Sequence, residues 1–149
     1  MIYMSNKANK IYQKHLSILH REDIEKLLKL GYKFYEIADC IQKHKTTISK
    51  EVLRNRIEHR PSNFNNKTNF CKHRYTCTLK NICSSNCHTL CNNCPKCNSI
   101  CSNFEVELCN KLTKAPYVCN ACSSYSSCKK IKYIYIATEA QKKYEHSLV

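Results

Sequence analysis

The sequence predicts a mainly α-helical protein, in which a small three-helix helix-turn-helix domain precedes a cysteine-rich module with little regular structure and a C-terminal helix. Two regions of helical apolar spacing, residues 16–56 and 137–149, predict the helices. Twelve of the 13 cysteines lie between Cys71 and Cys128, in a segment with too few aliphatic residues for an ordinary hydrophobic core. Bound metal would have to replace core burial as the organising interaction there.

The first helix is predicted from the apolar residues Ile24, Leu27 and Leu28. Ser17 precedes this group and belongs to the residue types preferred at an N-cap. Gly31 follows it, where a glycine in the left-handed conformation commonly ends a helix. These two residues bound the first predicted helix.

Two further helical groups follow at close range. The second has apolar residues at Phe34, Ile37, Ala38 and Ile41, and the third at Ile48, Val52 and Leu53. Thr46 and Thr47 are the candidate caps of the third helix. Only residues 42–45 separate the two groups, and a turn that short makes two helices cross sharply, as in a helix-turn-helix.

The third helix has the features of a DNA-recognition helix. Ala38 is small enough to let the second and third helices approach, and Ile48 provides the apolar anchor of the third. The residues expected to face outward and contact DNA are Thr46, Thr47, Ser49, Lys50 and Arg54. Hydroxyl groups at a helix N-terminus bind phosphate, and long basic side chains reach base edges or the backbone. The alternative is an ordinary three-helix bundle whose third helix carries solvated charges.

The turn between these helices lacks a glycine. Gln42 stands at the position that glycine often holds in a helix-turn-helix, and Gly31 is the single glycine of the chain. A residue with a side chain tolerates a strained backbone less well than glycine does. We therefore expect a slightly different turn here.

The chain is strongly basic, with a formal net charge of +14 and a sequence pI of about 9.3. This charge favours a polyanionic partner, either nucleic acid or an acidic membrane surface. Residues 1–15 carry no apolar run of signal-peptide length, and no stretch is long enough to span a bilayer. We therefore expect a cytoplasmic protein without membrane association, in which thiols stay reduced.

Clustered, reduced cysteines usually bind metal, and zinc is the expected ion. The candidate ligands are Cys71, Cys77, Cys83, Cys87, Cys91, Cys94, Cys97, Cys101, Cys109, Cys119, Cys122 and Cys128. A gap of two residues, as from Cys119 to Cys122, lets two thiolates reach one tetrahedral ion at Zn–S distances of about 2.3 Å. Twelve ligands would fill about three four-cysteine sites. Metal clusters that share bridging thiolates are the alternative arrangement.

The spacing does not assign the cysteines to particular ions. The preferred quartet closes the cluster and consists of Cys109, Cys119, Cys122 and Cys128. His73 and His88 can substitute as ligands but are more typical of polar surface positions. Cys40 lies alone in a helical pattern and is expected to be a small buried apolar residue. Iron–sulfur ligation and a secreted disulfide scaffold are the less favoured alternatives.

These patterns divide the chain into five segments. They are a basic arm (1–15), the helix-turn-helix domain (16–56), a linker (57–70), the cysteine-rich zinc-binding module (71–130) and the start of a connecting helix (131–149). We expect the helices of the second segment to have an apolar core of their own and to withstand metal removal. Twelve thiolates and three Zn²⁺ ions would contribute a net charge of about −6, which leaves the chain basic at about +8.

Two sequence blocks resemble a known family. The run TTISKEVLRN (46–55) resembles the recognition helix of the IS-thirty family of bacterial insertion-sequence transposases. The block APYVCNACSSYSSCKKIKYIYIATEAQKKY (115–144) resembles an insert in some Gram-positive members. Lys50 and Gln42 depart from the arginine and the glycine of the family pattern. The resemblance covers roughly residues 12–149.

The resemblance implies the DNA-binding part of a bacterial, nucleoid-associated transposase, which binds double-stranded DNA at terminal inverted repeats. It also implies no catalysis by this chain. The Asp-Asp-Glu domain of the family is missing, and the two aspartates, Asp23 and Asp39, fall in the predicted helices. One alternative is a stand-alone regulator that represses transposition or transcription. Another is a metal-binding module whose cysteines dock a second protein, and homo-oligomerisation stays open.

Overall fold

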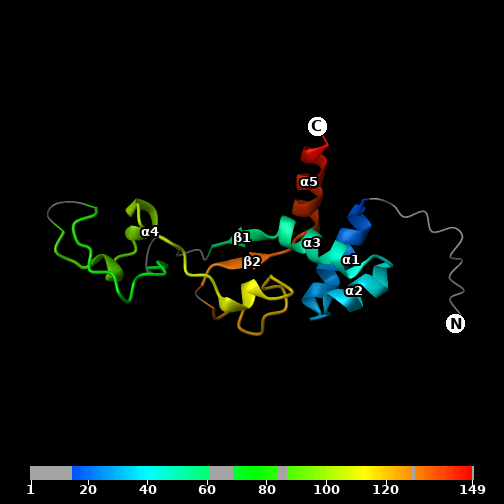
Figure 1. Ribbon diagram of the computed structural model, residues 1–149, viewed down its shortest axis with the longest axis horizontal. Helices are drawn as coiled ribbons and strands as arrows, with labels where there is room; N and C mark the ends of the chain where they lie inside the picture. The colour runs from blue at the N-terminus through cyan, green and yellow to red at the C-terminus, as the bar shows by residue number, and fades with distance from the viewer. Residues whose placement is uncertain (1–14, 61–68, 84–86, 129, 149) are drawn as a thin grey trace, which may run out of the picture.

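The computed structural model describes residues 15–60, 69–83, 87–128 and 130–148 (Figure 1). The elements in chain order are α1 (Ile18–Lys29), α2 (Phe34–Ile41), α3 (Lys45–Asn55), β1 (Ile57–His59), the 3-10 helix η2 (Cys91–Asn93), α4 (Cys97–Ile100), the 3-10 helix η3 (Asn110–Thr113), β2 (Lys132–Ile134) and α5 (Ala137–Ser147). The molecule is elongated, with α1, α2, α3 and α5 at one end and α4 at the other. This arrangement confirms the predicted fold class. Most of the predicted basic arm lies outside the described residues.

Both predicted ends of α1 are confirmed. The Ser17 hydroxyl oxygen accepts a hydrogen bond from the His20 backbone N–H at 3.2 Å, and the Ser17 N–H donates to His20 Nδ1 at 3.1 Å. At the other end Gly31 has a φ of +83°, which a residue with a side chain rarely adopts. The N–H groups of Gly31 and Tyr32 donate to carbonyls of the last helical turn at 3.0 Å each. These bonds form a Schellman motif, which satisfies carbonyls left free at the helix end.

In the turn between α2 and α3, Gln42 adopts the left-handed backbone conformation that glycine usually provides. Gln42 has φ 55° and ψ 49°, and the Lys43 N–H donates to the Ala38 carbonyl at 3.0 Å. The expectation of a different turn was therefore wrong. The side chain of Gln42 is exposed, so the unfavourable conformation costs backbone energy without any clash in the core.

The start and the outer face of α3 also correct the sequence interpretation. His44 is the N-cap, and its Nδ1 accepts a hydrogen bond from the Thr46 N–H at 3.2 Å. Thr46 and Thr47 therefore lie in the first helical turn and are not the caps. Leu53, predicted as an apolar core position, is 46% exposed. It lies next to Val52, which occupies the core side of the helix.

The main hydrophobic core lies among α1, α2 and α3 but includes distant residues. Its fully buried centre from the three helices consists of Ile24, Leu28, Ile37, Ile48 and Val52. Val118, Tyr135 and Ala140 complete the same cluster. Helix α5 packs against α1, so it belongs to the helical unit and is more than a connection to further sequence. The prediction of a self-sufficient core within residues 16–56 was incomplete.

A two-stranded antiparallel sheet replaces the first part of the predicted linker 57–70. Ile57 pairs with Ile134, and His59 pairs with Lys132. The sheet follows α3 directly and leads back into α5, so it brings two segments far apart in sequence side by side (Figure 1). Within the described residues, no helix combines the length and apolar character needed to cross a membrane.

A second, smaller core lies beside this sheet. Phe70 and Ile131 are buried at its centre, with Phe104, Val106 and Tyr133 packed against them. The cysteine-rich module therefore has some apolar organisation of its own. The described part of its backbone nevertheless has little regular structure, as predicted.

Candidate functional site

The predicted DNA-contacting residues share one side of α3. Four of them are exposed and Ser49 is half-buried; the exposed ones are Thr46, Thr47, Lys50 and Arg54. Ile48, between them in sequence, is fully buried in the core. The helix therefore separates its anchoring residue from its outward face as a recognition helix must.

Sequence reasoning missed two features of this outward face. Lys45, the first residue of α3, is exposed and adds a positive charge at the helix start. Leu53 is an exposed apolar side chain close in sequence to Lys50 and Arg54. An exposed apolar side chain on a recognition helix suits contact with the methyl group of thymine. The Thr46 hydroxyl oxygen lies 2.8 Å from His44 Nδ1, so it takes part in the cap.

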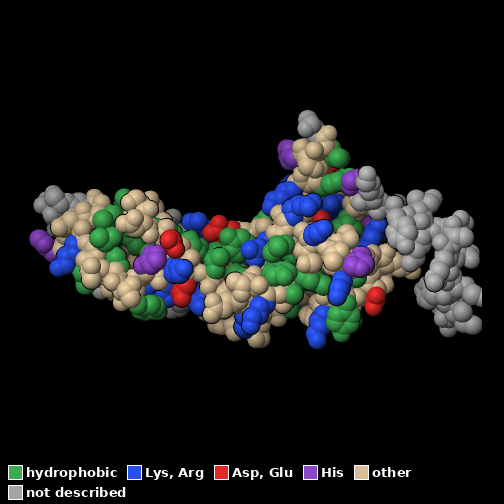
Figure 2. Space-filling view, viewed as in Figure 1, with side chains coloured by type: hydrophobic (Ala, Val, Ile, Leu, Met, Phe, Trp, Pro, Cys, Tyr) green, Lys and Arg blue, Asp and Glu red, His purple; other side chains and the backbone are tan. Residues whose placement is uncertain are grey.

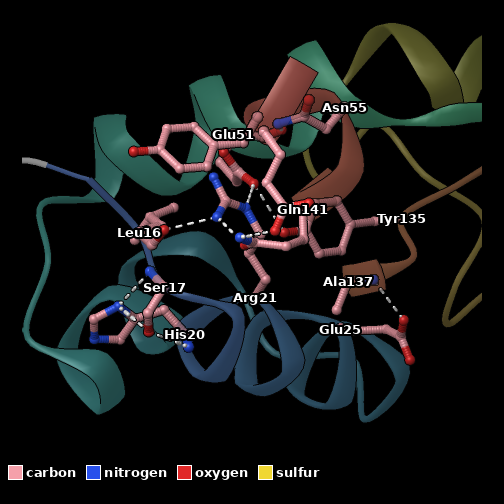
Figure 3. Close-up of polar contacts among 12 residues, drawn as sticks. Leu16, Ser17, His20, Arg21, Glu25, Glu51, Asn55, Tyr135, Ala137 and Gln141 are labelled. Atoms are coloured by element: carbon pink, nitrogen blue, oxygen red, sulfur yellow. Dashed lines mark hydrogen bonds and ion pairs between the residues drawn. The ribbon is translucent and has the colours of Figure 1, made fainter. Parts of the chain in front are cut away.

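A buried polar network fixes the orientation of α3 (Figure 3). Arg21 Nε on α1 lies 2.7 Å from Glu51 Oε1 on α3, and their side chains are 3% and 9% exposed. The Tyr135 hydroxyl donates to the same carboxylate oxygen at 3.0 Å. Arg21 Nη1 donates to the Leu16 carbonyl at 2.7 Å and to Gln141 Oε1 at 2.6 Å. Arg21 thus connects α3 with α1, with α5 and with the segment before α1.

The tyrosine of this network is held in its neutral form. Burial, followed by the negative charge of Glu51, raises the pKa of the Tyr135 hydroxyl. A neutral hydroxyl can donate to the carboxylate at all physiological pH values. The Glu51 carboxylate therefore has two donors in the core, Arg21 and Tyr135, which a buried charge requires.

Groups of four or five cysteines line three cavities in the described part of the chain. One of about 280 Å³ is lined by Cys71, Cys77, Cys91, Cys97 and Cys101. A narrower one is lined by Cys83, Cys87, Cys91, Cys94 and Cys97. A third of about 50 Å³ is lined by Cys109, Cys119, Cys122 and Cys128, the quartet preferred from the sequence. Each of the twelve predicted ligands therefore lines at least one cavity.

The backbone around the third cavity positions its thiols. The Cys122 N–H donates to the Cys119 carbonyl at 3.1 Å, which forms the turn expected of a CxxC pair. The Cys119 N–H donates to the Tyr133 carbonyl on β2 at 2.7 Å. Burial and then the neighbouring thiols of Cys122, Cys109 and Cys128 raise the pKa of Cys119.

The thiols surround these cavities without converging on a point. Among the described residues, no group of three or more His, Cys, Asp or Glu side chains has the arrangement needed to hold a metal ion. In the first cluster, burial and the neighbouring thiols of Cys71, Cys101 and Cys91 raise the pKa of Cys97 to about 11. In this structure the thiols line shared cavities.

The remaining candidates lie apart from these cavities or at their edges. Cys40 is exposed on α2, which corrects the expectation of a buried apolar residue. His73 and His88 are exposed, and His73 Nε2 lies 3.5 Å from Glu105 Oε2. Both histidines therefore have the surface positions that the sequence favoured.

The helical unit is similar to a known protein family. Residues 13–55 match a family described as a helix-turn-helix domain. This match spans α1, α2 and α3 and ends on the last residue of the recognition helix. The helix-turn-helix domain indicates DNA binding and makes DNA the indicated partner. Comparison with curated proteins and with solved structures gives no match.

Arg56 connects the helix-turn-helix domain to the cysteine-rich module. It follows α3 directly, and its Nη1 donates to the carbonyls of Leu112 at 3.2 Å and Tyr117 at 2.9 Å. Its guanidinium carbon lies 4.6 Å from the centre of the Tyr133 ring on β2. These contacts fix the segment around η3 against the C-terminal end of the recognition helix.

Proposed function

We propose that the chain binds double-stranded DNA sequence-specifically through α3, as the DNA-binding part of an insertion-sequence transposase. The proposal rests on the outward face of α3, where Thr47, Lys50 and Arg54 are exposed on a helix-turn-helix domain. The formal net charge of +14 supports a nucleic-acid partner.

Each residue of this face has a distinct proposed role. Lys50, at the middle of α3, donates to guanine O6 and N7 in the major groove. Thr47 lies three residues earlier on the same face and contacts the adjacent base or phosphate. Arg54 lies one turn further along and neutralises a backbone phosphate. The N–H groups at the start of α3, next to Lys45, face a second phosphate.

Terminal inverted repeats are the proposed DNA site, on the strength of the sequence resemblance to the IS-thirty family. We propose that the chain supplies recognition and no strand chemistry. Its aspartates, Asp23 and Asp39, are exposed on α1 and α2, whereas the strand chemistry of the family needs three carboxylates that hold two metal ions. DNA transposition would then depend on a catalytic domain outside this sequence.

Zinc is the proposed cofactor of the cysteine-rich module, at about three ions per chain. The support is the distribution of the twelve thiols around three cavities, with two of them, Cys91 and Cys97, lining both of the first two. A metal ion bound by the thiolate forms of these cysteines would draw the ligands together. The ions would then stabilise a segment that has only a small apolar core.

Selection of bound sequences from a random DNA pool, with the terminal repeats of related elements included, tests the proposed function. Enrichment of one motif, with binding to it lost in a Lys50→Ala/Arg54→Ala variant, is the expected result. A Lys142→Ala/Lys143→Ala variant provides the matched control, because it removes the same charge from exposed positions on α5. Equal binding of all sequences by the wild-type protein would contradict the proposal.

A further inference from the structure

A basic groove lies between the helix-turn-helix domain and the cysteine-rich module. It is an open cavity of about 900 Å³, bounded on one side by the start of α2 and on the other by residues 111–123. The helical side contributes Lys33 and Lys45, and the module contributes Lys111 and Lys114. In Figure 2, Lys and Arg side chains (blue) lie over both the helical end and the middle of the molecule.

The groove has the chemistry of a phosphate-backbone site. Four of its lining residues are lysines, and no acidic residue is found among the described residues that line it. The aromatic side chains of Tyr32 and Tyr35 also line it, and both are exposed. Lysine ammonium groups and tyrosine hydroxyls are common donors to DNA phosphates, while apolar surface can contact the sugars.

The module side of the groove is held rigidly relative to the recognition helix. Arg56 binds the carbonyls of Leu112 and Tyr117, which lie on either side of Lys114 in sequence. The Tyr117 ring centre lies 6.0 Å from that of Phe34, and Val118 is part of the main core. Lys111 and Lys114 therefore keep a fixed place beside the helix-turn-helix domain.

We propose that this groove binds the DNA backbone next to the segment that α3 reads, so that Lys111 and Lys114 extend the DNA contact beyond the helix-turn-helix domain. The inference rests on the proposed function and adds the cysteine-rich module as a second DNA-contacting part. Lys33 and Lys45 lie at the starts of α2 and α3, the helix ends that face DNA in helix-turn-helix proteins. The groove continues from these ends to the module, so a duplex bound to α3 would meet all four lysines.

Salt-dependent DNA binding by the full chain tests this inference. In a Lys111→Gln/Lys114→Gln variant, the slope of log K against log salt concentration should become less steep by about two, since each phosphate contact contributes about 0.9. Hydroxyl-radical footprinting should show protection lost at one edge of the site, with the centre retained. Lys111→Arg/Lys114→Arg should keep the wild-type slope and the wild-type protection. Lys142→Gln/Lys143→Gln should also change neither the slope nor the protection.

The outcomes separate this inference from the proposed function. If the Lys111→Gln/Lys114→Gln variant folds, as judged by circular dichroism, and keeps the wild-type slope and footprint, the groove does not bind DNA. The groove inference is then overturned even if Lys50→Ala weakens sequence-specific binding. If neither Lys50→Ala nor the groove variant affects DNA binding, the proposed function fails together with the inference. An equal loss in the α5 control would show a general charge effect and would also overturn the groove inference.

Discussion

Arg21 and Glu51 are charged residues with the surroundings of core residues. Both are almost fully buried, and their ion pair links α1 to α3 at 2.7 Å. Sequence reasoning did not find the pair, because the two residues are 30 positions apart and each looks like an ordinary surface charge on an amphipathic helix. Removal of one partner of a buried ion pair strongly destabilises the fold, because the other charge is then left uncompensated.

Arg21→Ala should therefore lower the free energy of unfolding by about 3–5 kcal/mol. The reason is the Glu51 carboxylate, which keeps only Tyr135 as a side-chain donor in the core. Urea denaturation measures the change. Lys29→Ala is the matched control because it breaks an exposed pair with Glu25, worth about 0.3–0.5 kcal/mol. Equal effects of the two substitutions would contradict the assigned role of the buried network.

His20 gives the start of α1 a predicted pH dependence. Burial and then the positive charge of Lys43 lower the pKa of His20 below its ordinary value of 6.5. The unfolded chain therefore binds the proton first as pH falls. Stability from the neutral ring, which accepts from the Ser17 N–H, is complete above pH 6.5 and is lost as pH falls below that value.

Thermal unfolding between pH 7.5 and 5 measures this effect. The melting temperature of the wild-type protein should fall on acidification more than that of His20→Gln, which has an uncharged acceptor at the same position. Parallel curves for the two proteins would show that His20 does not contribute to the pH dependence.

At the scale of elements, short-range patterns predicted α1, α2, α3 and α5 and missed the sheet. The spacing of Phe34, Ile37, Ala38 and Ile41 and the short turn after them predicted α2, and the caps of α1 followed from Ser17 and Gly31. The pairing of β1 with β2 was not predictable in this way, because the paired residues Ile57 and Ile134 are far apart in sequence. Three-residue strands are too short for an alternation to be recognised.

The turn between α2 and α3 gives a prediction at this scale. Gln42→Gly should raise the free energy of unfolding by up to about 1 kcal/mol, because glycine adopts the left-handed conformation without the steric cost of a side chain. DNA affinity should stay unchanged, since Gln42 already has the backbone conformation that glycine would adopt there. Chemical denaturation and DNA titration check the two parts. A destabilised Gln42→Gly protein would contradict the left-handed turn.

At the scale of the molecule, the helix-turn-helix domain and the cysteine-rich module depend on each other. The sequence predicted that the helices of residues 16–56 would withstand metal removal, but Val118 from the module lies in their core and Arg56 binds module carbonyls. The contributions of Tyr135 and Ala140 to the same core were also missed. A residue distant in sequence joins a core through tertiary packing, which the periodicity of one helix cannot show.

Chelation of the purified protein should therefore reduce both the order of the module and the stability of the helices. Elemental analysis should give about three zinc ions per chain before chelation. Cys119→Ser should lose about one ion and lower the melting temperature, while Cys40→Ser should keep all three because Cys40 is exposed on α2. Less than one zinc per chain, with cysteines oxidised in pairs, would contradict zinc as the organising ion.

The affinities of Lys50→Ala and Arg54→Ala for the selected site, and for single-base variants of it, test whether α3 reads DNA sequence. Lys50→Ala should lose about 1–3 kcal/mol at the selected site and relax discrimination at one base pair. Arg54→Ala should weaken all sequences about equally and make the salt slope less steep by about one. If both variants remain folded and keep the wild-type affinity, specificity and salt slope, α3 is not the reading helix.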